Sequence, residues 1–274
     1  MQNSNYYVTT ARGRWVLTLF EHLPPPALTF YLDLMAHLAG KGLPCPRPLA
    51  DGAGRTWRPL AGKPAALFTC LAGHDVAVPD PRHCRQVGAA LARLHAAGAD
   101  FPDPLPNPCG AAWRQAVGAE LMPLLTPGEQ ALLADELAFQ ACLDLGGLPR
   151  GIIHADLFRD NVLWQDGRLS GLLDFYFAGE DCLLFDLAVT ANDWCADEAT
   201  LAALVAGYES ERPLLAAEAT AWPALRRAAA LRFWLLRLQV RHHPQAGAVV
   251  TVKDPDQFRR LLERLRLAPA PLPR

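Results

Sequence analysis

Alternating apolar and aromatic positions near the start of the chain predict a small antiparallel sheet. Residues 6–9 (YYVT) and 15–20 (WVLTLF) are rich in β-branched and aromatic side chains, and a tight turn lies between them. A third stretch of the same kind covers residues 65–71 (AALFTCL). Between residues 28 and 38, apolar side chains recur at helical spacing. Residues 1–72 are therefore expected to form a small β-rich lobe with one helix.

Helical periodicity dominates the rest of the chain. It predicts helical structure over residues 80–98, 111–145 and 182–267. Residues 148–178 have strand character instead, and residues 224–240 are apolar around almost the whole helix circumference, which is typical of a central, buried helix. We therefore expect residues 73–274 to form a larger helical lobe and the whole chain to have an α+β, two-lobed architecture.

Composition narrows the class of protein. The chain has 274 residues, of which 51% are hydrophobic and 20% charged, and its formal net charge is −2. These values argue against a disordered tail protein and against a nucleic-acid partner. The seven cysteines are widely spaced without a CxxC pair, which favours reduced thiols over a disulfide framework. There is no signal peptide pattern and no run of about 18 apolar residues, so we expect a cytoplasmic protein with no membrane partner.

The side chains that carry chemistry gather in residues 151–175. An apolar strand runs into His154 and Asp156, and two further strands follow, joined by an Asp-Gly turn. This hairpin would return the chain to the end of the first strand and bring Asn161 beside Asp174. Oxygen ligands near a third carboxylate suit a magnesium-phosphate site, because Mg²⁺ prefers hard oxygens and keeps its other positions for water and phosphate.

The pattern HxDxxxxN, followed by a second Asp at a strand end, resembles the kinase-fold phosphotransferases, and within them the aminoglycoside and choline kinase-like branch. Further stretches, in order along nearly the whole chain, resemble the homoserine kinases of that branch. These stretches are residues 3–6, 17–21, 42–48, 91–95, 154–158, 173–178 and 230–233. The resemblance implies a two-lobed, protein-kinase-like fold. It also implies an ATP- and Mg²⁺-dependent kinase of threonine biosynthesis that phosphorylates the hydroxyl of L-homoserine to give O-phospho-L-homoserine.

Carried over residue by residue, the resemblance makes Asp156 the catalytic base and Asn161 and Asp174 the metal ligands. His154 would brace the loop. A strand-like hinge near residues 68–73 would offer the backbone of Thr69, Cys70 and Leu71 to adenine. The residues implied at the ATP site are Asn5, Thr18, Phe68, Thr69, Cys70, Leu71 and Leu163.

The acceptor end follows from the chemistry of homoserine. Its α-carboxylate and α-ammonium call for an arginine together with a carboxylate or amide. Arg232 lies in an otherwise apolar helix, where an unpaired guanidinium would be costly, so we expect it to have a partner and to bind substrate. By family analogy, Tyr176 and Trp194 would line the pocket. The side chains that would meet the ammonium are Asp181, Asp186, Asn192 and Asp193.

Two features depart from the family pattern. Thr18 stands on the strand where many relatives carry a lysine that contacts the α- and β-phosphates, and none of the three lysines of this chain is on that strand. Arg12 and Arg14 are the candidates to replace it. Relatives also begin with a helix and a first strand, whereas this chain begins at the phosphate-covering loop, so we expect the small lobe to lack its first strand.

Three alternatives stay open. One keeps the kinase chemistry but changes the acceptor to choline, an aminoglycoside or methylthioribose. Another is a truncated, non-catalytic nucleotide-binding protein, which the absent lysine and first strand motivate. The third is a zinc site built from His95, His154 and Asp156, although their spacing is not typical of zinc ligands.

Overall fold

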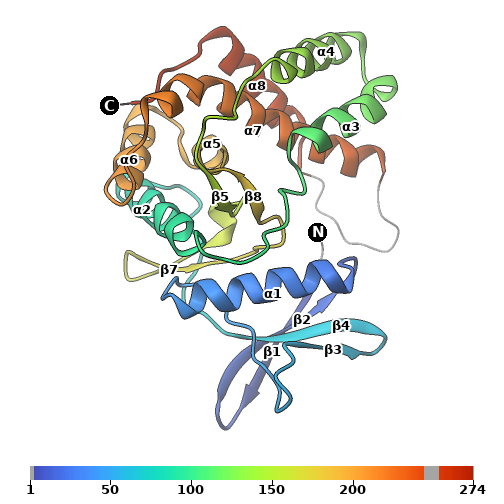
Figure 1. Ribbon diagram of the computed structural model, residues 1–274, viewed down its shortest axis with the longest axis vertical. Helices are drawn as coiled ribbons and strands as arrows, with labels where there is room; N and C mark the ends of the chain where they lie inside the picture. Colours follow the sequence, from blue (N-terminus) through green and yellow to red (C-terminus); the bar gives the residue numbers. More distant parts are fainter. Residues whose placement is uncertain (1–2, 244–252, 274) are drawn as a thin grey trace.

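The computed structural model describes residues 3–243 and 253–273, and it shows a small sheet lobe below a larger helical lobe (Figure 1). The sheet of the small lobe is four-stranded and antiparallel, in the order β1-β2-β4-β3. Its strands are β1 (Asn3–Thr10), β2 (Gly13–Phe20), β3 (Trp57–Leu60) and β4 (Lys63–Thr69). The sequence predicted three of these strands and missed β3.

Helix α1 (Pro25–Gly40) lies between this sheet and the helical lobe (Figure 1). Pro25 and Pro26 stand in its first turn, where a missing N–H costs nothing. Leu28, Leu32 and Leu34 are fully buried, and the helix joins the hydrophobic core that runs through both lobes. The predicted two-lobed arrangement is therefore confirmed.

Seven helices build the larger lobe within the described ranges. They are α2 (Pro81–Ala97), α3 (Ala111–Leu121), α4 (Pro127–Ala141), α5 (Leu183–Trp194), α6 (Glu198–Glu209), α7 (Ala216–His242) and α8 (Asp256–Leu267). Short 3-10 turns cover Met122–Leu124 and Arg159–Asn161. Helix α7 runs through the centre, packed against α5 and α8, and Leu225, Leu231 and Leu235 on it are buried, as its apolar sequence predicted. Over the described residues, none of the helices combines the length and apolar character that a membrane crossing needs.

Two short antiparallel pairs carry the segment with the candidate chemistry. Strand β5 (Arg150–Ile153) pairs with β8 (Gly179–Cys182), and β6 (Val162–Gln165) pairs with β7 (Arg168–Leu172). The β6–β7 turn has φ of 52° at Asp166 and 73° at Gly167, the left-handed pair that suits a two-residue hairpin. The predicted hairpin is therefore present.

The segment at the end of β4, residues 69–73, contains the predicted lobe boundary, between residues 72 and 73; we call it the crossing segment. Gly73 has φ of 124°, and a Cβ at this position would lie 2.5 Å from the Ser170 hydroxyl and 2.7 Å from the Trp164 carbonyl. Ser170 also donates to the Ala72 carbonyl at 2.6 Å. The crossing segment is thus pressed against the β6–β7 hairpin, and only glycine fits at its tightest point.

Candidate active site

A buried carboxylate on α5 shapes the loop that follows β5. Both oxygens of Asp186 accept backbone N–H groups, from His154 at 2.7 Å and from Ala155 at 2.8 Å. Ala155 has φ of 63°, a left-handed conformation that a residue with a Cβ rarely adopts. The two hydrogen bonds hold the chain in this turn, and the turn presents Asp156 at the end of the strand.

His154 braces the same loop, as the resemblance implied. Its Nε2 atom lies 2.8 Å from the Leu173 carbonyl, and its Nδ1 atom accepts the Asp156 N–H at 3.2 Å. This pattern requires a proton on Nε2 only. Burial lowers the pKa of His154 despite the opposing charge of Asp186. His154 is therefore a neutral side chain that links the loop to the residue before Asp174.

Asp156 is the carboxylate with the most perturbed environment in the loop. Its side chain is 16% exposed, and Arg232 Nη1 lies 3.5 Å from its Oδ1 atom. Burial raises the pKa of Asp156 to about 7, even though Arg232 opposes the shift, and the charges of Asp174 and Asp160 add to it. A carboxyl group with a pKa near 7 is suited to take a proton at neutral pH.

The hairpin brings Asn161 and Asp174 together. The Leu173 N–H donates to the Asn161 carbonyl at 2.8 Å, which places the residue before Asp174 directly against Asn161. The Asn161 side-chain amide donates to the Asp156 carbonyl at 2.8 Å and lies 3.3 Å from Asp156 Oδ2. The amide oxygen of Asn161 is therefore the atom that remains to act as a ligand.

The donor set fits a divalent metal ion that also binds phosphate. In residues 3–243 and 253–273, no group of three or more His, Cys, Asp and Glu side chains is arranged to hold a metal ion. The zinc alternative is therefore wrong: His95 instead contacts Asp186 at 3.0 Å and the Tyr208 hydroxyl at 2.7 Å. Asn161 and Asp174 offer two hard oxygens, which suits an ion that keeps its other positions for phosphate and water.

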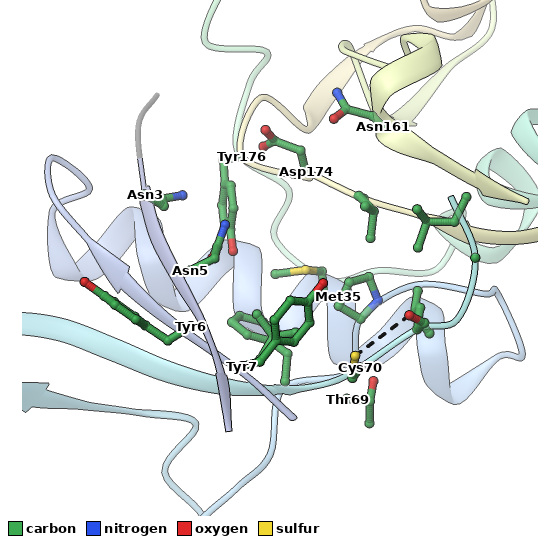
Figure 2. A pocket seen from close by; sticks show the side chains of 17 residues that line it. Asn3, Asn5, Tyr6, Tyr7, Met35, Thr69, Cys70, Asn161, Asp174 and Tyr176 are labelled. Atoms are coloured by element: carbon green, nitrogen blue, oxygen red, sulfur yellow. Dashed lines mark hydrogen bonds between the residues drawn. The ribbon is translucent and has the colours of Figure 1, made fainter. Parts of the chain in front are cut away.

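A cavity of about 540 Å³, which we call the interlobe cavity, is lined by residues of both lobes. Asn161 and Asp174 lie at one end of it, and Thr69 and Cys70 lie at the other (Figure 2). Six of the seven residues predicted for the ATP site line it: Asn5, Phe68, Thr69, Cys70, Leu71 and Leu163. The crossing segment and the predicted metal ligands thus share one cavity.

Several lining residues of the interlobe cavity were not predicted. Tyr6, Tyr7 and Val16 line it from β1 and β2, and Met35 reaches it from α1. Strand alternation was the available signal for part of this set, because Asn3, Asn5 and Tyr7 fall on one face of β1. The contribution of α1 depends on how the helix packs and has no local signal.

A second cavity, of about 250 Å³, shares Asn161 and Asp174 with the first and includes Asp156 in its lining; we call it the Asp156 cavity. Its apolar lining residues are Phe158, Phe177, Phe233, Leu236 and Val240. Its other charged lining residues are Asp160, Arg237 and Lys253. Asp156 therefore lies where a small molecule in this cavity would meet a nucleotide in the other.

Most of the residues predicted to bind the acceptor do not belong to the lining of the Asp156 cavity. Arg232 is fully buried and pairs with Asp156, so it has a partner, as expected. Its guanidinium packs on Phe233 and is not part of the cavity lining. Trp194 is 1% exposed and its indole N–H donates to the Leu157 carbonyl at 2.9 Å. Helix α5 turns this side chain into the core, so Trp194 does not line a pocket.

Tyr176 and Asp181 are also outside the Asp156 cavity. Tyr176 lines the interlobe cavity, where its ring packs edge-on against Phe20. Asp181 accepts from Asn107 at 2.8 Å and pairs with Arg150 at 3.4 Å. These hydrogen bonds and ion pairs join β8 to its neighbours.

The remaining three residues suggested for the ammonium serve the structure instead. Asp186 is committed to the loop amides, as described above. Asn192 pairs with Arg226, and Asp193 forms an ion pair with Arg159 at 3.1 Å. Besides Asp156 and Asp174, the carboxylate of Asp160 belongs to the lining of the Asp156 cavity.

Comparison with known proteins decides the family. Residues 1–227 match the Phosphotransferase enzyme family, APH. The chain belongs to this family. The match covers the loop, the hairpin and both predicted metal ligands.

Two relatives within the phosphotransferase family match almost the whole chain. The homoserine kinase of Methylobacillus flagellatus is 46% identical over 267 residues, which are 95% of this chain and 84% of the relative. The homoserine kinase of Neisseria meningitidis is 47% identical over 268 residues, covering 95% of this chain and 87% of the relative.

Solved structures of other phosphotransferases show the shared fold. The amicoumacin kinase hAmiN, in complex with AMP-PNP, Ca²⁺ and Ami, superimposes with a TM-score of 0.71 at 15% identity, over 99% of this chain and 87% of its own. Choline kinase from Cryptosporidium parvum gives a TM-score of 0.70 at 14% identity, over 97% and 87%. The predicted protein-kinase-like fold is therefore confirmed.

The phosphotransferase site of this chain has no cation at the lysine position of β2. Thr18 is 4% exposed and its hydroxyl donates to Asn5 Oδ1 at 2.7 Å, so it acts on the interlobe cavity only through Asn5. Arg14 stacks on the Tyr7 ring at 3.7 Å. In the described part of the chain, no lysine or arginine lines the interlobe cavity. In the adjoining Asp156 cavity, the lining residues include two cations, Arg237 and Lys253.

Proposed function

We propose that this protein catalyses the ATP-dependent phosphorylation of the hydroxyl of L-homoserine, giving O-phospho-L-homoserine for threonine biosynthesis. The observation that carries the proposal is that Asp156 lines a cavity which shares Asn161 and Asp174 with the interlobe cavity. Relatives of 46% and 47% identity over nearly the whole chain bear the name homoserine kinase. Because ATP is made and used inside the cell, we place the reaction in the cytoplasm.

Different residues would bind the nucleotide, orient the acceptor and accept its proton. The backbone of Thr69, Cys70 and Leu71 would bind adenine at one end of the interlobe cavity, and the phosphates would extend toward Asp174. Asp156 would orient the acceptor hydroxyl for in-line attack and accept its proton as the new O–P bond forms. Neutral His154 and the hydrogen bonds of Asp186 keep Asp156 in place during this step.

Asn161 and Asp174 would hold Mg²⁺, which neutralises charge on the ATP phosphates when it is bound. Their hard oxygens favour this ion over a soft metal. Chelation with EDTA is therefore expected to stop ADP formation, and added Mg²⁺ is expected to restore it.

The size of the Asp156 cavity supports homoserine over the larger alternatives. A space of about 250 Å³ suits a small amino acid, whereas an aminoglycoside carries several linked rings. The non-catalytic alternative has less support, because Asp156, Asn161 and Asp174 are all present and held by hydrogen bonds or by the hairpin.

An acceptor panel tests the proposal. ADP release is measured with ATP, Mg²⁺ and one of L-homoserine, choline, an aminoglycoside or methylthioribose, and the product is identified by mass. We expect phosphorylated homoserine to form with the largest kcat/KM. Activity on another acceptor with none on homoserine would refute the assignment, and no activity on any of them would favour the non-catalytic protein.

A further inference from the structure

The Asp156 cavity has charges of both signs beside an apolar lining. Asp160 supplies a carboxylate, while Arg237 and Lys253 supply two cations. Phe177 and Phe233 belong to the apolar lining. A zwitterion with a short apolar chain matches this combination, because each charged end would find a group of opposite sign.

Arg237 is on helix α7, and residues at or just before the start of helix α8 hold its guanidinium in position. The residue is 9% exposed, and its Nη1 atom donates to the Asp254 carbonyl at 2.7 Å and to Gln257 Oε1 at 2.8 Å. The guanidinium also packs 4.5 Å from the centre of the Phe258 ring. Among the described residues, these hydrogen bonds use Nη1 and leave Nε and Nη2, a pair of donors with the geometry that a carboxylate accepts.

Several carboxylates surround Arg237 at its position in the lining of the Asp156 cavity. Burial lowers the pKa of Arg237, and the carboxylates of Asp193, Asp254, Asp160 and Asp156 oppose that shift. Arg237 therefore lies close enough to the catalytic carboxylate to feel its charge.

Asp160 and Lys253 form an ion pair at 2.8 Å in which both side chains are more than half exposed. An exposed pair of this kind contributes little to stability, so a ligand with two charges can replace it. The ammonium of the ligand would then take the place of Lys253 beside Asp160. Lys253 would be free to join Arg237 at the carboxylate.

We propose that the Asp156 cavity recognises its acceptor as an α-amino acid, with Arg237 binding the α-carboxylate and Asp160 binding the α-ammonium. The inference rests on the proposed function and deepens it. The hydroxyl-bearing carbons lie along Phe177 and Phe233, with the hydroxyl at Asp156. Cationic acceptors without a carboxylate, such as choline, are disfavoured because they meet Arg237 and Lys253 with no group to neutralise them.

The test compares homoserine with 3-aminopropan-1-ol, which keeps the ammonium and hydroxyl but lacks the carboxylate. In Arg237→Gln, we expect kcat/KM for homoserine to fall about 10- to 100-fold, the size of a lost charge-assisted hydrogen bond. The kcat/KM for 3-aminopropan-1-ol should change less than about threefold, because this compound has no carboxylate for Arg237 to bind. Its affinity is also measured by competition with homoserine, so that a slow acceptor still gives a value.

Controls separate recognition from structure. Arg237→Lys should restore part of the preference for homoserine, whereas the matched control Arg241→Gln, at an exposed position of α7, should leave both values unchanged. A structural defect would lower both acceptors together and leave their ratio intact. The assignment of Arg237 is overturned if Arg237→Gln leaves the ratio of kcat/KM for homoserine to kcat/KM for 3-aminopropan-1-ol unchanged. It is also overturned if the variant raises only the KM for ATP.

The ammonium is tested with 4-hydroxybutanoate, which keeps the carboxylate and hydroxyl but lacks the amine. Asp160→Asn should reduce the preference for homoserine over this analogue at least about tenfold, and Asp166→Asn in the β6–β7 turn is the matched control. An unchanged preference overturns the role of Asp160. If the unsubstituted protein phosphorylates homoserine while these ratios stay unchanged, only the present inference fails. If it does not phosphorylate homoserine at all, the proposed function fails with it.

Discussion

The Asp186 carboxylate accepts the backbone N–H of Ala155 at 2.8 Å, and through this bond helix α5 fixes the loop that carries Asp156, the proposed catalytic base. Asp186 is fully buried, and its second oxygen serves the His154 N–H and lies 3.0 Å from His95. Ala155 would not otherwise favour its φ of 63°. The loop that carries Asp156 therefore depends on a residue that lines neither of the two cavities.

Asp186→Asn tests this dependence. Burial alone would raise the pKa of Asp186. The hydrogen bond and charge of His95, together with the charge and backbone hydrogen bond of His154, outweigh burial, so the pKa is lowered overall. A carboxylate with a lowered pKa stabilises the fold above its unfolded value of about 4, and that contribution is lost as the pH falls through the folded value. We expect the variant to lose about 3 kcal/mol in urea unfolding at pH 7.

The pH dependence gives the same experiment a second readout. The stability difference between the unsubstituted protein and Asp186→Asn should begin to narrow as the pH falls below the unfolded pKa of about 4, and it should narrow until the pH passes the lowered pKa of the folded carboxylate. Asp75→Asn, at an exposed position, should change stability by less than about 0.5 kcal/mol at either pH. A difference that stays constant with pH would contradict the ionised role of Asp186.

Gly73→Ala tests the close approach of the crossing segment to the β6–β7 hairpin. The added methyl group would lie 2.5 Å from the Ser170 hydroxyl, on a backbone with φ of 124°. We expect a loss of more than about 2 kcal/mol, measured by urea unfolding, and a higher KM for ATP. The control is Gly167→Ala, which has φ of 73° but nothing within 4 Å of the new methyl group, and it should cost about 1 kcal/mol. Equal losses in the two variants would refute the steric account.

Thr18→Val tests how the small lobe positions Asn5 without a lysine at this point of β2. The change keeps the side-chain shape and removes the hydroxyl that donates to Asn5 Oδ1 at 2.7 Å. We expect KM for ATP to rise about three- to tenfold while kcat stays within about twofold, because one hydrogen bond that orients a lining residue is lost. Thr9→Val, at an exposed position of β1, should change neither constant. An unaltered KM for ATP in Thr18→Val would show that Asn5 does not contact the nucleotide.

The environment of Asp156 predicts a pH profile. Because burial raises the pKa of Asp156 to about 7, a growing share of the carboxyl group is protonated as the pH falls below that value, and the protonated form cannot accept the hydroxyl proton. We therefore expect kcat/KM for homoserine to rise with pH through about 7 when it is measured between about pH 5 and 9. A profile that stays flat down to about pH 5 would contradict this role of burial.

Local pattern was enough to predict most of the fold. The apolar alternation of β1, β2 and β4 and the helical spacing of α1 and α2 are visible in the sequence, as is the central burial of α7. Strand β3 was missed because Arg58, Pro59 and Leu60 are exposed and carry no alternation. The strand forms because it pairs with the edge of β4, where Pro59 lies opposite Pro64. Pairing of this kind leaves no local signal in the sequence.

The site was predictable where chain connectivity sets it and not where packing does. A two-residue turn brings Asn161 next to Asp174, so their proximity followed from the hairpin. Arg232 and Arg237 stand five positions apart on one helix, and both are arginines in an apolar sequence. In the folded protein, Arg232 packs on Phe233 and is fully buried, whereas Arg237 packs on Phe258 and lines the Asp156 cavity. This difference depends on packing, so the sequence pattern does not reveal it.

The turnover of Asp156→Asn, with saturating ATP, Mg²⁺ and L-homoserine, tests the central claim most directly. The variant removes the proton acceptor and keeps the side-chain shape, so circular dichroism should show an unchanged fold, and kcat should fall about 10²- to 10⁴-fold. Asp166→Asn should retain normal turnover. A value of kcat for Asp156→Asn within about threefold of the unsubstituted protein would contradict the claim that Asp156 is the base of this kinase.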